Sequence, residues 1–294
     1  MSAEGRPPLT GHTRVVGVIG DPVAHSLSPT LHNAAFEVLG LDWVYVAFPV
    51  ARGRGADAVA AVSALGLAGL NVTMPHKEDV ADACDDLTAD AAALRSVNTV
   101  VARPGGRTLG DSTDGPGFLD ALADEEIGVG GQPVLVLGAG GAARAVVLAL
   151  GRAGAQVTVA ARRPDAAESA AALAPAGVAV PLGAIGPPAG PSAAGAVDPG
   201  AFSVVVNATP LGMSGGDPLP VEPGALHAGQ AVVDLVYHPA DTPLLTAARA
   251  RGALAVNGLG MLLHQAARSF TLWTGEPAPI EAMRAAVTAG LADR

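Results

Sequence analysis

Short apolar runs alternate with longer segments rich in alanine and leucine along the whole chain. The runs are typical of buried β-strands, and the segments between them are typical of amphipathic helices. In the N-terminal part, helices are predicted over 29–39 and 56–65. The strands predicted around them are VVGVI (15–19), VYVAF (44–48), GLNV (69–72) and VNTVV (97–101).

The same alternation starts again after the sequence TDGPGF at 113–118. Here the predicted strands are PVLVL (133–137), QVTVA (156–160), SVVVN (203–207), AVVDLV (231–236) and ALAV (253–256). Apolar strands that alternate with helices predict mainly parallel sheets with both faces covered. Two such series predict an α/β protein of two α/β domains, with the boundary near Asp114–Pro116. The Pro- and Gly-rich stretch 181–200 has no period and is interpreted as a surface connection within the second domain.

A glycine-rich turn lies between a predicted strand and a predicted helix in VLVLGAGGAARAVVLAL, residues 134–150. Gly138 permits a tight turn, Gly140 lets a pyrophosphate approach the backbone, and the small Ala143 lets the helix pack closely on the strand. The N–H groups at the start of the helix can bind phosphate. Such glycines also occur in ordinary turns, but the strand before them and the helix after them favour a dinucleotide site.

The strand that follows indicates which dinucleotide is bound. It ends in Arg162 and Arg163, with no acid before Asp165. An acid at this point would hold the ribose 2′-OH of NAD, whereas arginine accommodates the 2′-phosphate of NADP. Two surface arginines also occur in ordinary loops, but their position at the adenosine end favours NADP.

Two serines follow the first strand in DPVAHSLSP, residues 21–29. Because Ser26 and Ser28 alternate, both hydroxyls would point to one side of an extended segment, where the pair could hold a carboxylate. Capping of a helix by Ser28 is the alternative, and this segment alone favours neither.

Lys77 is the one lysine among 17 basic residues and ends the sequence NVTMPHK, which begins at a predicted strand end. Lysine can shift its pKa and exchange a proton, whereas arginine stays protonated. A single lysine is ordinarily a surface residue. However, Asn98 and Asp114 also follow strand ends, and a carboxylate within hydrogen-bond reach would orient the amine. Lys77 is therefore a candidate for proton exchange, and Asp114 is its candidate partner.

Composition limits the classes of partner. The net charge of −10 argues against nucleic acid and anionic membrane surfaces, but a small anionic ligand needs only a local site. Cys84 is the one cysteine, so no intramolecular disulfide can form. His264 is one step off the face shared by Met261 and Gln265 and is interpreted as a packing or surface residue. With no metal-ligand spacing, no signal region and no apolar span, we predict a cytoplasmic protein without a metal.

Eight segments in order resemble the shikimate dehydrogenase family over essentially the whole chain. They are SLSP, NVTMPHK, VNTV, TDGPGF, GAGGAA, NATPLGM, DLVYHP and GLGMLLHQ. The resemblance implies a substrate-binding domain at 1–114 and a Rossmann-type NADP-binding domain at 115–259, with C-terminal helices at 260–294 returning to the first domain. The implied activity is the reversible, NADP-dependent reduction of 3-dehydroshikimate to shikimate in chorismate and aromatic amino acid biosynthesis.

The resemblance also implies a role for each candidate residue. Lys77 and Asp114 would be the catalytic pair. The substrate would be bound by Ser26 and Ser28 at its carboxylate and by Thr73, Asn98, Asp114 and Gln265 at its hydroxyls, with Tyr237 nearby. The cofactor would contact Gly138, Ala139, Gly140, Gly141 and Ala142 at the pyrophosphate, Arg162 with Arg163 beside it at the 2′-phosphate, and the backbones of Leu235 and Gly258 at the nicotinamide.

Two positions depart from the family pattern. The family usually has Asn-Arg-Ser/Thr where this chain has Ala161-Arg162-Arg163, which removes an amide and adds a cation near the adenosine. The family usually has Asn-Thr-Asp where this chain has Ser112-Thr113-Asp114, which keeps the carboxylate.

The sequence leaves three alternative functions open. Quinate and aminoshikimate dehydrogenases share these motifs, although the serine pair and the arginines favour shikimate and NADP. A non-catalytic ligand sensor is opposed by the presence of Lys77 and Asp114 and by the lack of a basic helix. A homodimer is left open.

Overall fold

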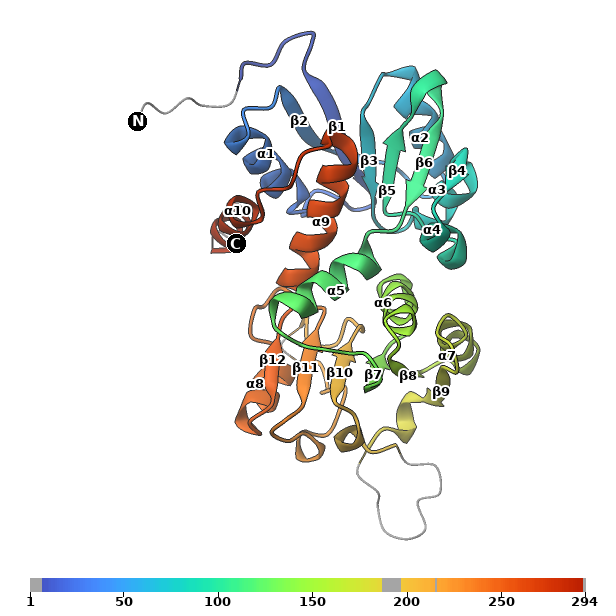
Figure 1. The fold of residues 1–294 in the computed structure, drawn as a ribbon, viewed down its shortest axis with the longest axis vertical. Coiled ribbons are helices and arrows are strands. Elements are labelled where there is room, and N and C mark those ends of the chain that lie inside the picture. Colours follow the sequence, from blue (N-terminus) through green and yellow to red (C-terminus); the bar gives the residue numbers. More distant parts are fainter. Residues whose placement is uncertain (1–6, 187–196, 215, 293–294) are drawn as a thin grey trace. The chain divides into compact units, whose positions relative to one another are not determined.

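The computed structural model describes residues 7–186, 197–214 and 216–292, and the chain separates into two compact units. The first unit contains Met1–Thr113 and Leu263–Arg294, and the second contains Asp114–Leu262. In the colours of Figure 1, the first unit is the blue-to-teal part of the chain together with the red C-terminal helices. The C-terminal helices therefore pack with the N-terminal part of the chain.

The first unit is built on a six-stranded sheet in the order β2-β1-β3-β5-β6-β4. The strands are β1 (Arg14–Gly20), β2 (Trp43–Pro49), β3 (Gly69–Val72), β4 (Asp86–Leu87), β5 (Thr99–Ala102) and β6 (Thr108–Asp111). Pairing is parallel for β1 with β2 and β3 and for β4 with β6, but antiparallel for β5 with both its neighbours. The short strands β4 and β6 were not predicted.

Helices cover both faces of this sheet. They are α1 (Ser28–Val38), α2 (Gly55–Ala64), α3 (Lys77–Ala83), α4 (Ala89–Leu94), the larger part of α9 (Leu259–Thr274) and α10 (Ile280–Ala292), with a 3-10 turn η1 (Pro104–Gly106). Apolar side chains of α2 and α3, such as Val59 and Val80, bury one face of the sheet. On α9, Trp273 Nε1 donates to the Val100 carbonyl over 3.0 Å. Gly69 provides the space, because a Cβ there would lie 2.2 Å from that nitrogen.

The second unit is an entirely parallel sheet in the order β12-β11-β10-β7-β8-β9. Its strands are β7 (Pro133–Leu137), β8 (Gln156–Ala161), β9 (Val178–Pro181), β10 (Val204–Asn207), β11 (Ala231–Asp234) and β12 (Leu254–Val256). Counted within the unit from β9, this is the 3-2-1-4-5-6 order of a Rossmann fold. The architecture confirms the predicted fold class.

The helices of the second unit are α5 (Asp114–Asp124), α6 (Gly141–Arg152), α7 (Pro164–Ala171) and α8 (Pro243–Ala250), with 3-10 turns η2 (Leu182–Ala184), η3 (Pro199–Ala201) and η4 (Pro223–Ala225). One core cluster includes Phe118 and Val146, and a second includes Leu244 and Leu245. In the segment 181–200, the structure forms the end of β9, η2 and η3, and residues 187–196 lie outside the described residues.

In the first unit, aromatic rings pack around His32, which is fully buried. His32 stacks on Tyr45 with ring centroids 4.4 Å apart, and the other rings are Phe36, Trp43, Phe270 and Trp273. Neither ring nitrogen of His32 has a hydrogen-bond partner among the described residues. Burial therefore lowers the pKa of His32 to about 3.

The buried histidine makes stability depend on pH with a known sign. Because the folded pKa lies near 3 and the ordinary value is 6.5, the unfolded chain takes up a proton first as the pH falls. The free energy of unfolding should therefore fall by about 2 kcal/mol between pH 7 and pH 5 through this residue alone, at about 1.4 kcal/mol per pH unit below 6.5. His32→Phe should lose this part of the slope in urea unfolding at the two pH values. His12→Phe, which changes an exposed ring, should keep it, and an unchanged slope in His32→Phe would contradict the prediction.

Candidate active site

The glycine-rich turn lies at the point where the strand order of the second unit reverses, between β7 and β10. Gly138 follows β7 with φ at +112°, and a Cβ on it would lie 2.8 Å from the Ala208 carbonyl oxygen. Its N–H donates to the Ala160 carbonyl over 2.8 Å. A side chain is therefore excluded at Gly138 by both its conformation and its neighbours.

Gly140 and Gly141 lie at the N-terminal end of α6 and, unlike Gly138, have open space around them. Both are exposed, and a Cβ on either would meet no described atom within 4 Å. The protein's own packing thus leaves the space above them open, next to the positive N-terminal end of a helix of 12 residues. Ala139 and Ala142 flank them and are half-buried. This open cradle fits the pyrophosphate of a dinucleotide.

The two arginines after β8 differ in their surroundings. Both are exposed, and Arg163 forms a two-pronged ion pair with Asp165, with Nη2 at 2.5 Å and Nε at 3.3 Å from the carboxylate oxygens. This contact raises the pKa of Arg163 and lowers the pKa of Asp165. For Arg162, in contrast, the described residues show no such contact with a carboxylate.

Buried polar side chains hold the ends of β10 and β11 together. Asp234 is fully buried, accepts from Asn207 Nδ2 at 2.9 Å and from Thr242 Oγ1 at 2.7 Å, and also accepts from the Val236 N–H. Burial raises the pKa of Asp234, and these three donors oppose the shift. Sequence reasoning matched NATPLGM and DLVYHP as motifs but assigned nothing to these three side chains.

This network places the backbones predicted to face the nicotinamide. The Leu235 N–H donates to the Asn207 carbonyl over 2.9 Å, and the Gly258 N–H donates to the Val236 carbonyl over 3.2 Å. A Cβ on Gly258 would lie 2.1 Å from the Leu235 carbonyl oxygen, so only glycine allows this approach. Tyr237 follows on the same loop and is half-buried.

In the first unit, Lys77 is the first residue of α3 and is half-buried. The turn before it is fixed by the Thr73 N–H, which donates to the Ile19 carbonyl over 3.0 Å, and by the His76 N–H, which donates to the Thr73 carbonyl over 3.1 Å. The Val97 N–H donates to the Lys77 carbonyl over 2.9 Å. The loop after β3 is therefore joined to the chain just before Asn98.

Asn98 is buried at the entrance to β5. Its N–H donates to the Asp111 carbonyl over 3.0 Å, and its carbonyl accepts from the Val72 N–H over 2.8 Å. The structure thus brings Thr73, Lys77 and Asn98 to one end of the sheet of the first unit. Asp114 and Tyr237 belong to the second unit.

The serine pair adopts a conformation different from the one considered. Leu27 between the serines has helical angles, φ −87° and ψ −7°, so the segment is not extended there. Leu27 is also the N-cap residue of α1, and Ser28 is its first residue. Leu27 makes no side-chain capping bond, and Ser26 Oγ accepts from the Ser28 N–H at 3.2 Å. Both serines are half-buried.

On α9, Gln265 is half-buried and His264 is buried, which agrees with a packing role for the histidine. Ser269, one turn further along, was not singled out from the sequence, although it is fully buried and hydrogen-bonded. Among the described residues, no group of three or more His, Cys, Asp or Glu side chains is arranged to hold a metal ion. No described helix has the length and the apolar character needed to cross a membrane.

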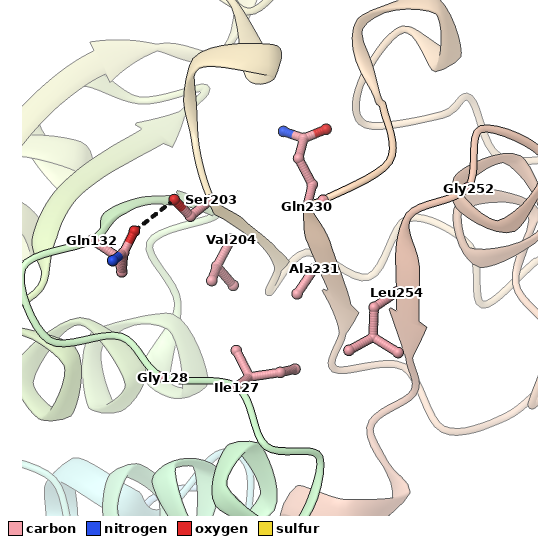
Figure 2. A pocket seen from close by; sticks show the side chains of 10 residues that line it. Ile127, Gly128, Gln132, Ser203, Val204, Gln230, Ala231, Gly252 and Leu254 are labelled. Carbon is pink, nitrogen blue, oxygen red and sulfur yellow. Dashed lines mark hydrogen bonds between the residues drawn. The ribbon is translucent and has the colours of Figure 1, made fainter.

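A pocket of about 420 Å³ lies at the opposite end of the second sheet from the glycine-rich turn. Figure 2 shows Val204, Ala231 and Leu254 at the starts of their strands, and Ser203 Oγ donating to Gln132 Oε1 at 2.8 Å. Ligands of open parallel sheets bind at the carboxyl ends of the strands. The pocket is therefore not assigned to the candidate active site.

A Rossmann sheet with a glycine-rich turn defines the second unit as that of a dinucleotide-binding protein. Family models match other parts of the chain: the shikimate dehydrogenase substrate binding domain matches residues 18–100, and the shikimate 5′-dehydrogenase C-terminal domain matches residues 258–288. A shikimate dehydrogenase (NADP(+)) of Acidiphilium cryptum is 46% identical over 284 residues, which cover 96% of this chain and 99% of its own. The chain belongs to the shikimate dehydrogenase family.

Solved structures give the same result. The crystal structure of a shikimate dehydrogenase in complex with NADP+ has a TM-score of 0.89 and 34% identity, with 99% of each chain covered. That of Thermus thermophilus in complex with NADP(H) and shikimate has a TM-score of 0.84 and 36% identity, with 95% and 100% covered. A quinate dehydrogenase of Corynebacterium glutamicum in complex with NAD also matches, with a TM-score of 0.84, 31% identity, and 94% and 99% covered.

Proposed function

We propose that this protein catalyses the reversible, NADP-dependent reduction of 3-dehydroshikimate to shikimate, the dehydrogenase step of chorismate and aromatic amino acid biosynthesis. The observation that carries the proposal is the family relationship over 96% of the chain to a relative named for shikimate and NADP(+). The open cradle at Gly140 and Gly141 and the exposed Arg162 support the cofactor. A cytoplasmic location is part of the proposal, since a single cysteine suits a reducing compartment.

The residues are assigned as follows. Ser26 and Ser28 bind the substrate carboxylate, and Thr73, Asn98 and Gln265 bind its hydroxyls, with Tyr237 nearby. Lys77 gives a proton to the carbonyl oxygen of the substrate and takes it back in the reverse direction, while Asp114 orients the ammonium group and a ring hydroxyl. NADP(H), when bound along Gly138–Ala142 with Leu235 and Gly258 beside its nicotinamide, supplies or accepts the hydride.

The function itself is tested by comparing substrates and cofactors side by side. Initial rates should be measured from NADPH or NADH absorbance, with shikimate and quinate in separate assays. We expect the highest kcat/KM for shikimate with NADP+. A preference for quinate with NAD+ would instead assign the activity of the quinate dehydrogenase relative, and no turnover of either substrate would favour a non-catalytic sensor.

Lys77→Ala tests the acid–base assignment. Loss of general acid–base help should lower kcat by roughly 10²- to 10⁴-fold, with shikimate and NADP+ still bound in calorimetric titrations. Lys77→Arg keeps the charge but not the exchangeable proton, so it should remain similarly slow. Arg107→Ala, which removes an exposed cation of the same unit, is the control and should keep wild-type turnover. Recovery of turnover in Lys77→Arg would show that the role of Lys77 is purely electrostatic.

Arg162→Ala tests the cofactor assignment. Loss of a charge-assisted contact to the 2′-phosphate should raise the KM for NADP+ by roughly 10- to 100-fold and leave the KM for NAD+ nearly unchanged. Arg163→Ala is the matched control and should have a smaller effect, because that guanidinium already binds Asp165. Equal effects of the two variants on NADP+ would contradict the assignment.

A further inference from the structure

A buried hydrogen-bond network lies beneath Asn98 in the first unit. It joins side chains of β2, β3, β5 and α9 with those of Asn98 and Thr113, and none of these side chains is more than 7% exposed. Its members are Tyr45, Asn71, Asn98, Thr99, Thr113 and Ser269. The proposed function uses only Asn98 from this set.

Asn71 is the centre of the network. Its Oδ1 accepts from the Tyr45 hydroxyl at 2.8 Å. Its Nδ2 lies 3.0 Å from Ser269 Oγ, 3.2 Å from Thr99 Oγ1 and 3.1 Å from the Asn98 carbonyl oxygen. The polar atoms of this buried amide are therefore all directed at partners inside the unit.

The network fixes which way the Asn98 amide faces. Asn98 Oδ1 accepts from the Thr113 N–H at 2.8 Å and from Thr99 Oγ1 at 3.1 Å. Asn98 Nδ2 donates to Thr113 Oγ1 at 2.9 Å. A flipped amide would set its NH2 group against the Thr113 N–H, donor against donor, so the orientation with Oδ1 inward is strongly favoured.

Ser269 connects this amide to the helix that carries Gln265. Ser269 Oγ lies 2.8 Å from Thr99 Oγ1 and 3.0 Å from the Gln265 carbonyl oxygen, and its one hydroxyl proton can serve only one of these acceptors. When Ser269 donates to Thr99 Oγ1, the Thr99 proton is left for Asn98 Oδ1, so the two hydroxyls form a chain that ends on the Asn98 amide. Apolar side chains would fill these fully buried positions without any need for partners, so simple packing does not account for the hydroxyls.

We propose that Asn71, Thr99 and Ser269 are positioning residues, which hold the Asn98 amide with Oδ1 turned inward so that it meets a substrate hydroxyl with its N–H side. This inference rests on the proposed function, because it takes Asn98 as a hydroxyl-binding residue. Such positioning residues act on substrate binding through Asn98 and have no contact of their own with the substrate.

Thr99→Val is the primary test, because valine keeps the shape of threonine and removes only the hydroxyl. Steady-state rates with shikimate at saturating NADP+ should show kcat/KM lowered by roughly 5- to 30-fold, mainly through a higher KM, as expected for one lost hydrogen bond that orients a binding group. Thr99→Ser restores the hydroxyl and should recover most of the loss.

A double-mutant cycle separates positioning from general destabilisation. If Thr99 acts through Asn98, Thr99→Val should change kcat/KM by less than about 2-fold in an Asn98→Ala background. Equal losses in the two backgrounds, or no loss in the wild-type background, would overturn the proposal. Ser269→Ala, analysed in the same cycle, carries the test if Thr99→Val does not fold.

Thr108→Val is the matched control. Thr108 is a buried threonine at the other end of the β5–β6 pairing, where it exchanges hydrogen bonds with Asp85. Its replacement should lower the melting temperature without raising the KM for shikimate. A wild-type enzyme that does not oxidise shikimate would refute the proposed function, whereas an active enzyme indifferent to Thr99→Val would refute this inference alone.

Discussion

Each polar atom of a buried amide needs a hydrogen-bond partner, and the interior of the first unit depends on this constraint. Asn71 lies in β3 and is buried, and the core around it is aliphatic and aromatic. Its partners come from β2, from β5 and from a helix almost 200 residues later in the chain. The return of the C-terminal segment to the first unit therefore completes a hydrogen-bond network as well as an apolar core. Removing α9 would take Ser269 Oγ, one of three acceptors, from Asn71 Nδ2 and would remove Trp273 from the space beside Gly69.

The second unit solves a similar problem with a carboxylate. Asp234 is surrounded by an amide, a hydroxyl and a backbone N–H, all neutral donors, and its burial raises its pKa. These donors come from the last residue of β10 and from the segment that follows β11, at the strand ends where the Rossmann fold places its ligand. In each unit, buried polar side chains thus fix loop ends that carry proposed binding groups. The His32 ring shows the opposite arrangement, since burial without partners keeps it neutral and gives it no proton-transfer role.

The sequence predicted the two α/β series, the Rossmann turn and the family, because each depends on local periodicity or on ordered motifs. It did not predict β4, β6 and β9, since strands of two to four residues carry little pattern of their own. It considered an extended Ser26–Ser28 segment, but Leu27 adopts helical angles because it is the N-cap of α1, which begins at Ser28. Ser269 and Thr242 were missed for a different reason. A small hydroxyl residue in a helix or at its cap has no periodic signal, and its importance comes only from partners that are distant in the sequence.

The chain has a net charge of −10 and is nevertheless expected to bind two anionic molecules, so the positive potential must be local. Two sources are visible in the second unit: the N-terminal end of α6 and the arginines after β8. The helix end is built from backbone dipoles and does not depend on the charged residues around it. The arginines do depend on them, because Asp165 already neutralises Arg163 in an exposed pair. Exposed ion pairs contribute little stability, but while this pair is formed the Arg163 guanidinium is occupied. Arg162, for which the described residues show no such carboxylate, is therefore the arginine expected to meet the 2′-phosphate.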